Sequence, residues 1–103
     1  MSDELSEDEK RARAIALLEA NHVFPTDYGI SVIAHSADEV AARVAAAAFA
    51  DGPAERPASA HEMRPSSGGK YISHRLTIRC EDAAHVLRVY ARLRAVDGVL
   101  TIL

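Results

Sequence analysis

The residues with the most obvious chemical potential form the run Ser66–Lys70 (SSGGK), which stands directly before an alternating segment. Hydroxyls, glycines and a lysine also build the P-loop, where backbone N–H groups and a helix N-terminus converge on a phosphate. That motif needs Ser or Thr after the lysine and then a helix, whereas here Tyr71 begins a predicted strand. We therefore interpret the run as a tight connection between two strands, with a ligand- or partner-binding loop as the alternative.

The strand that should follow this loop carries the other polar candidates. Tyr71–Cys80 alternates polar and apolar residues, which is typical of a strand with one covered face. The candidate ligand- or partner-binding residues are Ser66, Ser67, Gly69, Lys70, Tyr71, Ser73 and Arg75. The strand also has a faint likeness to the RNA-recognition motif, which stacks bases on two or three aromatics, but it offers Tyr71 alone.

The charge distribution does not favour nucleic acid as a partner. The first 20 residues hold six of the 15 Asp and Glu residues and three of the 12 Lys and Arg residues. The rest of the chain therefore has nine acidic and nine basic residues and no net charge. A domain that binds nucleic acid electrostatically carries a net positive charge. RNA binding is therefore the weakest of the functional hypotheses.

The histidines and the single cysteine show no spacing typical of a metal or catalytic site. His74 falls among the apolar residues of its strand, where a core histidine with a polar partner is the common case. His35 lies on a neighbouring predicted strand and should face the opposite side of the sheet. Cys80 belongs to the apolar set, so we expect it to be buried and inert. No catalytic residue, metal, cofactor or enzymatic activity is predicted.

Composition bounds the class of protein. The chain has 103 residues, 49% of them hydrophobic and 26% charged, and a net charge of −3, which suits one globular domain with a modest core. Its N-terminus is acidic, unlike a signal peptide, and no apolar run reaches membrane-spanning length. We expect a cytoplasmic protein with no membrane partner.

Residues 1–21 are expected to form an acidic extension with a frayed lead and a short helix from about Lys10 to Asn21. Residues 22–103 then begin with a strand at Tyr28–His35. A helix to about Ala50 should follow, with Ser36 and Glu39 at capping-box spacing. Its predicted buried stripe is Val40, Val44, Ala47 and Ala48.

The second half repeats the same order of elements. Ala58–Arg64 reads as a weak strand, and the prolines on either side favour a sheet edge because proline removes a ladder donor. After Tyr71–Cys80 comes a helix from about Asp82 to Val96, and then a final strand at Val99–Leu103. The predicted buried stripe of that helix is Ala83, Val86, Leu87, Tyr90 and Leu93, with Arg88 and Arg92 on a solvated face.

A doubled strand–helix–strand unit closes, through right-handed crossovers, into a four-stranded antiparallel sheet with two helices on one face. The predicted fold is therefore α+β, a ferredoxin-like βαββαβ plait preceded by a short N-terminal helix. The first and third strands should be central. The helix-free face should carry Ser31, Ile33, Tyr71, Ser73, Arg75, Thr77 and Arg79.

Residues from about 22 to 103 resemble a known family at Phe24-Pro25, Pro65-Ser66-Ser67, Gly69, Tyr71, Ser73, Thr77, Tyr90, Leu93, Val99 and Leu103. This pattern is similar to that of the YbeD-like family of small bacterial proteins, described as lipoate regulatory proteins. The resemblance implies an ACT-like plait, small-molecule sensing and a regulatory part in lipoate metabolism, and it implies no catalytic residue. ACT domains usually place glycine at the first strand–helix turn, whereas this chain has Ala34-His35-Ser36-Ala37, which disfavours amino-acid binding.

Three functional hypotheses follow from these observations. The leading one is a non-enzymatic regulatory or adaptor module that binds a protein, or a second copy, through the helix-free face, the final strand or the Ser66–Lys70 loop. The second is an ACT-type sensor that binds a metabolite between protomers. The third is an RNA-binding plait.

Overall fold

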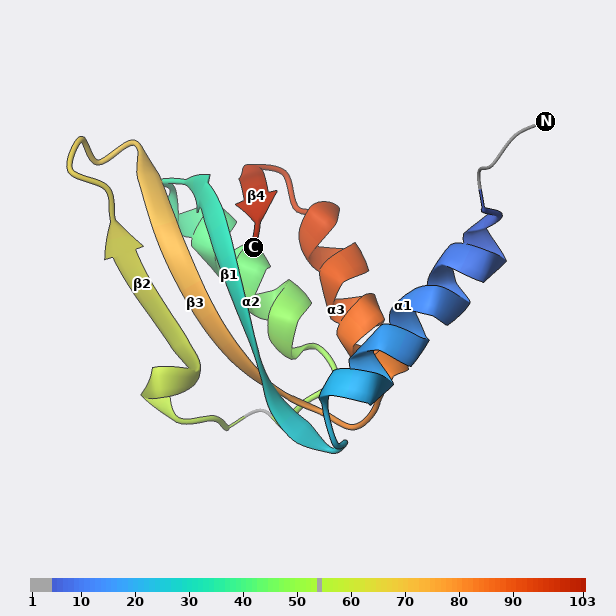
Figure 1. Cartoon of the computed structure of the whole chain (residues 1–103). Coiled ribbons are helices and arrows are strands. Elements are labelled where there is room, and N and C mark those ends of the chain that lie inside the picture. Colours follow the sequence, from blue (N-terminus) through green and yellow to red (C-terminus); the bar gives the residue numbers. More distant parts are fainter. Residues whose placement is uncertain (1–4, 54) are drawn as a thin grey trace.

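The computed structural model describes residues 5–53 and 55–103, and within them the chain folds as α+β (Figure 1). The elements, in chain order, are α1 (Glu7–Asn21), β1 (Thr26–His35), α2 (Asp38–Phe49), the 3-10 turn η1 (Ala58–Ala60), β2 (His61–Pro65), β3 (Tyr71–Cys80), α3 (Ala83–Arg94) and β4 (Val99–Ile102). The four strands form one antiparallel sheet in the order β2-β3-β1-β4.

The sheet is built on its two longest strands. β1 and β3 pair along their whole lengths, from Thr26 opposite Cys80 to His35 opposite Tyr71. β2 lies at one edge, where its prolines predicted it, but it begins later than expected. The segment Ala58–Ala60 forms a 3-10 turn, in which the Ala60 N–H donates to the Pro57 carbonyl at 3.0 Å instead of entering the ladder.

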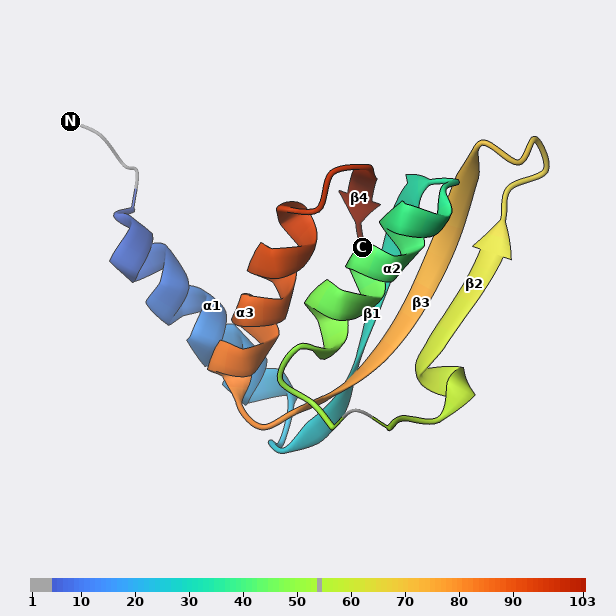
Figure 2. The ribbon, with the colours of Figure 1, turned by 180° about the vertical axis from the view of Figure 1, so that it is seen from behind.

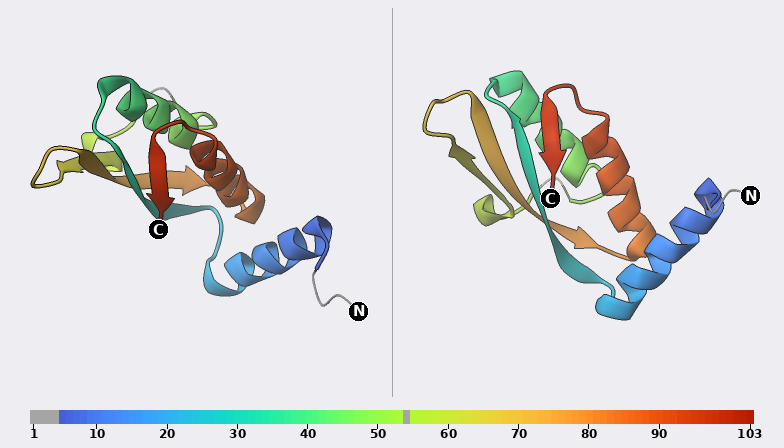
Figure 3. Two further views of the ribbon diagram at one scale, coloured as in Figure 1. Left: turned by 90° about the horizontal axis from the view of Figure 1, so that it is seen from above. Right: turned by 45° about the horizontal axis from the view of Figure 1, so that its top comes forward.

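One face of the sheet builds the core. Figure 3 shows α2 and α3 on the same side of the strands, and Figure 2 shows both helices in front of the sheet. The buried cluster comprises Ile30, Val32, Ala34, Leu76, Ile78 and Cys80 from the sheet, Val40, Val44, Ala47 and Ala48 from α2, and Val86, Val89 and Leu93 from α3. The predicted α2 stripe is confirmed in full, and the apolar set of β3 faces this core as expected.

The start of α2 differs from the prediction. The N-cap is Ala37, which has no side chain able to accept a hydrogen bond, so the Ser36–Glu39 capping box is wrong. Ser36 instead uses its backbone N–H to bond the Lys70 carbonyl at 3.0 Å. The turn between β1 and α2 is therefore tied to the loop between β2 and β3.

The buried stripe of α3 is rotated relative to the prediction. Ala83, Val86 and Leu93 are buried as expected, but His85 and Val89 are buried in place of Leu87 and Tyr90, which are half-buried. Tyr90 lies at the border because its ring packs edge-on against Tyr28, with centroids 6.4 Å apart. Asp82 caps the helix by accepting from the His85 N–H at 2.8 Å.

α1 begins earlier than the sequence predicted. Ser6 caps the helix by accepting from the Glu9 N–H at 3.1 Å, and acidic residues fill the first turn, so Glu7–Glu9 are helical rather than frayed. Residues 1–4 of the predicted lead lie outside the described residues. α1 has no fully buried residue, and Leu18 is the part of it that packs against the core.

Candidate functional site

The predicted helix-free surface exists as one continuous face of the sheet. Residues opposite one another in an antiparallel pair share a face, and Ser31 lies opposite Arg75 while Ile33 lies opposite Ser73. We call the set Ser31, Ile33, Tyr71, Ser73, Arg75, Thr77 and Arg79 the open face. All of its β3 members are exposed, and its β1 members are half-exposed.

The Ser66–Lys70 loop is organised by its own hydrogen bonds. The Ser66 N–H donates to the Tyr71 carbonyl at 2.9 Å, and the Ser66 hydroxyl accepts from the Tyr71 N–H at 3.2 Å. The Gly69 N–H donates to the Ser66 carbonyl at 3.0 Å, and Gly69 has a φ of +72°. These donors are engaged within the turn and not directed toward an anion, so the structure supports the interpretation of the run as a strand connection.

The structure brings some of the candidate residues together and leaves others apart. Tyr71 lies beside His35, with ring centroids 5.8 Å apart. Ser73 is flanked by Ile33 and Arg64, and Arg75 is flanked by Ser31 and Glu62, across the two neighbouring strands. A groove of about 580 Å³ follows these pairs and includes Leu103 at its far side. Ser67 and Lys70 are exposed on the loop beyond it.

A histidine pair lies on the opposite, covered side of the sheet, and sequence reasoning missed it. His61 Nε2 lies 2.8 Å from His74 Nδ1, and the two rings stack at 25°. Burial lowers the pKa of both side chains. The charge of Arg56 lowers the pKa of His61 further, and the charge of His61 lowers the pKa of His74 further. His74 is 1% exposed, and its Nε2 has no hydrogen-bond partner among the described residues.

The only sequence signal for this pair is the register of a hairpin. His61 and His74 are 13 residues apart in the sequence. Met63 lies opposite His74, and His61, two residues before Met63 on β2, is on the same face of the sheet as His74. A strand pair with known register would have placed the two rings together. The expectation that His35 and His74 face opposite sides is confirmed, because His35 is exposed and His74 is buried.

A second polar cluster joins the end of α2 to α3. Asp51 contacts Arg92 Nη2 directly, and its Oδ2 lies 3.4 Å from His85 Nε2 and 3.8 Å from Arg88 Nε. Arg92 also donates from Nε to the Ala47 carbonyl at 2.9 Å. The hydrogen bond from Arg92 holds the pKa of Asp51 below its usual value. The prediction of a solvated Arg88–Arg92 stripe is therefore confirmed for Arg88, which is exposed, and wrong for Arg92, which is half-buried against Asp51.

Cys80 lies buried in the core, as predicted. Burial raises the pKa of its thiol to about 11, so at neutral pH the sulfur is protonated and unreactive. Within the described residues, no group of three or more His, Cys, Asp or Glu side chains is arranged to hold a metal ion. The helices in that part of the chain are also too short or too polar to cross a membrane.

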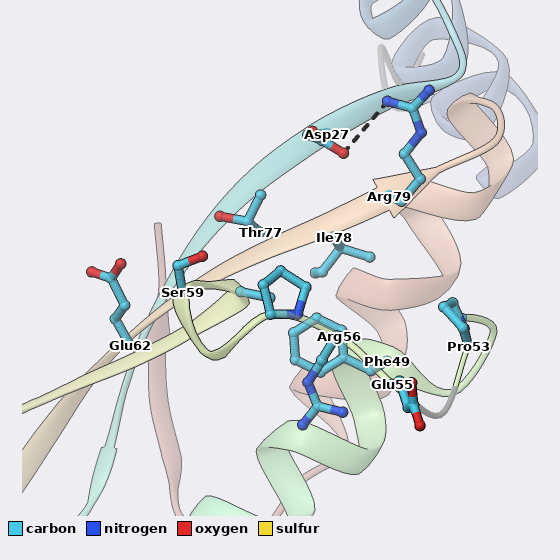
Figure 4. Close-up of a pocket in the computed structure, with 13 residues that line it drawn as sticks. Asp27, Phe49, Pro53, Glu55, Arg56, Ser59, Glu62, Thr77, Ile78 and Arg79 are labelled. Carbon is cyan, nitrogen blue, oxygen red and sulfur yellow. Dashed lines mark hydrogen bonds and ion pairs between the residues drawn. The ribbon is translucent and has the colours of Figure 1, made fainter.

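A cavity of about 480 Å³ lies between the loop after α2 and the lower end of β3 (Figure 4). Apolar groups from Phe49, Pro57, Ala60 and Ile78 line it. At its rim, Arg79 Nη1 lies 3.4 Å from Asp27 Oδ1, and the Arg56 guanidinium stacks over the Phe49 ring at 4.1 Å. These residues come from separate segments, so no local sequence pattern pointed to this cavity.

Comparison with known families matches residues 19–103, which include the sheet, α2 and α3, to DUF493, a family described as proteins of unknown function. The chain belongs to DUF493. Among curated proteins, no sequence matches this DUF493 member.

Proposed function

We propose that this DUF493 protein is a non-enzymatic regulatory or adaptor module that binds another protein through its open face. The fold we assign is a ferredoxin-like, ACT-like plait of the YbeD type. The proposal includes a cytoplasmic location, expected from the acidic N-terminus and the lack of a long apolar run, and a regulatory part in lipoate metabolism, taken from the sequence resemblance. The observation that carries it is an exposed sheet face with a groove along the Ser31–Arg75 and Ile33–Ser73 pairs.

The chemistry of this face suits a protein surface better than a reaction. Tyr71 and His35 present two neighbouring rings at its upper end, and such aromatics are enriched where proteins bind one another. Arg64 and Arg75 on the neighbouring strands and Lys70 on the loop before Tyr71 are exposed and add positive charge to this part of the surface. A partner with an acidic, partly apolar surface would complement this end of the sheet.

The two edges of the sheet differ in how well they resist further pairing. β2 carries Glu62, Arg64 and Pro65, which are typical protective residues of an edge strand. β4 has the sequence VLTI, without charge or proline, and Leu100 and Leu103 are exposed on and beside it. β4 can therefore extend the contact surface of the open face.

The ACT-type sensor has less support. A ligand bound at the turn between β1 and α2 would use the backbone N–H groups of that turn. The N–H of Ser36 is already bonded to the Lys70 carbonyl, and that of Ala37 to the His35 carbonyl at 3.1 Å. We therefore retain protein binding as the proposed function.

The test is affinity purification with mass spectrometry from the native cell, using the tagged full chain. We compare the wild type with the double variant Tyr71→Ala/Arg75→Glu, which changes only exposed side chains of the open face. The control is Arg43→Glu, which makes the same charge change on the exposed side of α2. We expect at least one protein to be captured by the wild type and the control but lost from the double variant.

A result with the same captured proteins in all three purifications would contradict the proposal. The double variant must also keep the wild-type circular dichroism spectrum and melting temperature, since surface changes of this kind usually alter stability by less than about 0.5 kcal/mol. Small-angle scattering of the wild type then shows whether the partner is a second copy.

A further inference from the structure

β2 covers only part of its neighbour β3. The last pair at this end of the β2–β3 ladder is His61 opposite Leu76, so Thr77–Cys80 pair with β1 on one side only. On the other side the chain turns away through η1, where the Ala60 N–H bonds to the Pro57 carbonyl. The lower end of β3 is therefore a free edge of a central strand.

The backbone groups at this edge can be assigned from the hydrogen-bond pattern. The Ser66 N–H donates to the Tyr71 carbonyl, so the backbone of Tyr71 points toward β2. Because alternate residues of an antiparallel strand point the same way, the backbone groups of Thr77 and Arg79 also point to the β2 side. In agreement, Ser31 exchanges both of its backbone bonds with Leu103, at 3.3 and 2.7 Å, which leaves the even-numbered residues of β1 to bond β3.

Three of these groups are open to a new partner. They are the carbonyl of Thr77 and the N–H and carbonyl of Arg79, and no backbone bond from another described segment reaches them. Successive residues in a strand are about 3.4 Å apart, so the two carbonyls repeat at roughly the spacing of alternate residues in an extended peptide. The cavity shown in Figure 4 lies along this same edge and is lined by both residues.

We propose that this edge of β3 binds an extended segment of a partner polypeptide, which adds to the sheet as a short strand in the line of β2. The side chain opposite Ile78 would face the apolar lining formed with Phe49 and Pro57. The side chain opposite Arg79 would lie on the open face beside its guanidinium. The favoured segment therefore carries an apolar residue next to an acidic one.

The charges around the cavity are mixed, with Asp27, Glu55 and Glu62 beside Arg56 and Arg79, so the preference for an acidic residue depends on Arg79. The ion pair between Arg79 and Asp27 is weak and well solvated, because the two side chains are 58% and 65% exposed at 3.4 Å. Arg79 can therefore turn to a carboxylate of the added strand at little cost. This site goes beyond the proposed function, since it lies at the opposite end of β3 from Tyr71 and uses backbone groups.

The probe is the hexapeptide acetyl-Thr-Val-Glu-Val-Glu-Thr-amide, titrated into the isotope-labelled full chain and followed by amide NMR. We expect the Arg79 N–H to exchange with solvent in the free chain and to become protected when the peptide binds. The amides of Ile78 and Cys80, which face β1, should be protected throughout. The same peptide with lysine in place of glutamate should bind several-fold more weakly.

Two variants of one residue separate the backbone contact from the side-chain contact. Arg79→Ala keeps the N–H and should weaken binding by only a few-fold. Arg79→Pro removes the N–H without touching a bond to β1 and should weaken binding about ten-fold more. If Arg79→Pro disturbs the fold, the peptide with both glutamates N-methylated makes the same test from the ligand side and should not bind, because the residues opposite Thr77 and Arg79 are the ones whose N–H groups face β3.

Four results would overturn the proposal. They are an Arg79 N–H that is protected in the free chain, a hexapeptide that shifts none of these amides, equal binding by the proline and alanine variants, and a wild-type dimer that Arg79→Pro converts to a monomer. The last would identify a second copy as the occupant. Tyr71→Ala should leave peptide binding unchanged. A failure of this proposal can therefore be distinguished from a failure of the proposed function.

Discussion

Gly98 sits where the chain leaves α3 for β4, and replacing it by alanine should be strongly destabilising for two separable reasons. Its φ is +98°, a conformation that residues with a side chain rarely adopt. A Cβ at this position would lie 2.8 Å from Cγ2 and 3.1 Å from Cγ1 of Val40, at the buried start of α2. The backbone cannot easily move away, because the Gly98 carbonyl accepts from the His35 N–H at 2.8 Å.

The two costs have different sizes. Forcing a residue with a Cβ to a positive φ costs about 1–2 kcal/mol, and overpacking a closed site costs about 1–3 kcal/mol more. We therefore expect Gly98→Ala to lower the free energy of unfolding by about 2–5 kcal/mol, a large share of the stability of so small a domain. Gly69 has a φ of +72° but open space around its Cβ position, so Gly69→Ala should show only the first cost.

The assay is urea unfolding followed by circular dichroism, with the wild type, both glycine variants and a cycle with Val40→Ala. Removing the Cγ atoms of Val40 should relieve the clash, so that Gly98→Ala costs about 1–3 kcal/mol less in that background than in the wild type. Equal costs in the two backgrounds would refute the steric part of the reasoning. Equal costs for the alanine variants of Gly69 and Gly98 would refute it as well.

Three further predictions concern the histidine pair, the Asp51 cluster and the buried cysteine. Burial lowers the pKa of His61 and His74 in the folded chain, so the unfolded chain binds more protons below the ordinary pKa of 6.5. The free energy of unfolding should therefore be constant above pH 6.5 and fall as the pH drops below it. Urea titrations at several pH values should show this dependence, and it should be weaker in His61→Leu/His74→Leu. Asp51→Asn should lower the free energy of unfolding by about 1 kcal/mol, less in high salt, because it weakens the ion pair with Arg92; a loss that does not depend on salt would contradict this. Cys80 should not react with a thiol reagent in the native chain but should react fully in urea, since burial keeps it protonated; rapid labelling of the native protein would show that the thiol is accessible.

Local periodicity made several elements predictable from the sequence. The alternation of Tyr71–Cys80 and the stripe from Val40 to Ala48 correspond to the faces that are buried in the structure. Both patterns encode burial within a single element, where the 2.0 or 3.6 residue period of the backbone fixes which side chains share a face. The ends of the elements were less well predicted. Ser6 caps α1, which begins earlier than expected, and the N-cap of α2 is Ala37 where Ser36 was predicted.

The contacts between elements depend on the tertiary structure. His61 meets His74 only through the register of β2 with β3, and Asp51 reaches Arg92 across 41 residues of sequence. The sequence alone assigned Tyr71, Ser73 and Arg75 to one face of the strand. It could not show that His35, Arg64 and Glu62 lie beside them. Register and helix packing decide such pairs, and neither has a period within one segment.

The sequence by itself determined the order of the main helices and strands and the apolar sides of α2 and β3, because the spacing of apolar residues repeats within each element. Only the tertiary structure decided that β2 stops at His61, that β3 continues to Cys80 beside it, and that Phe49 lies under the resulting gap. Strand lengths in a sheet are settled by competition between ladder bonds and local turns such as the one at Ala58–Ala60. That competition involves segments that are distant in sequence, so it is resolved only when the chain is folded.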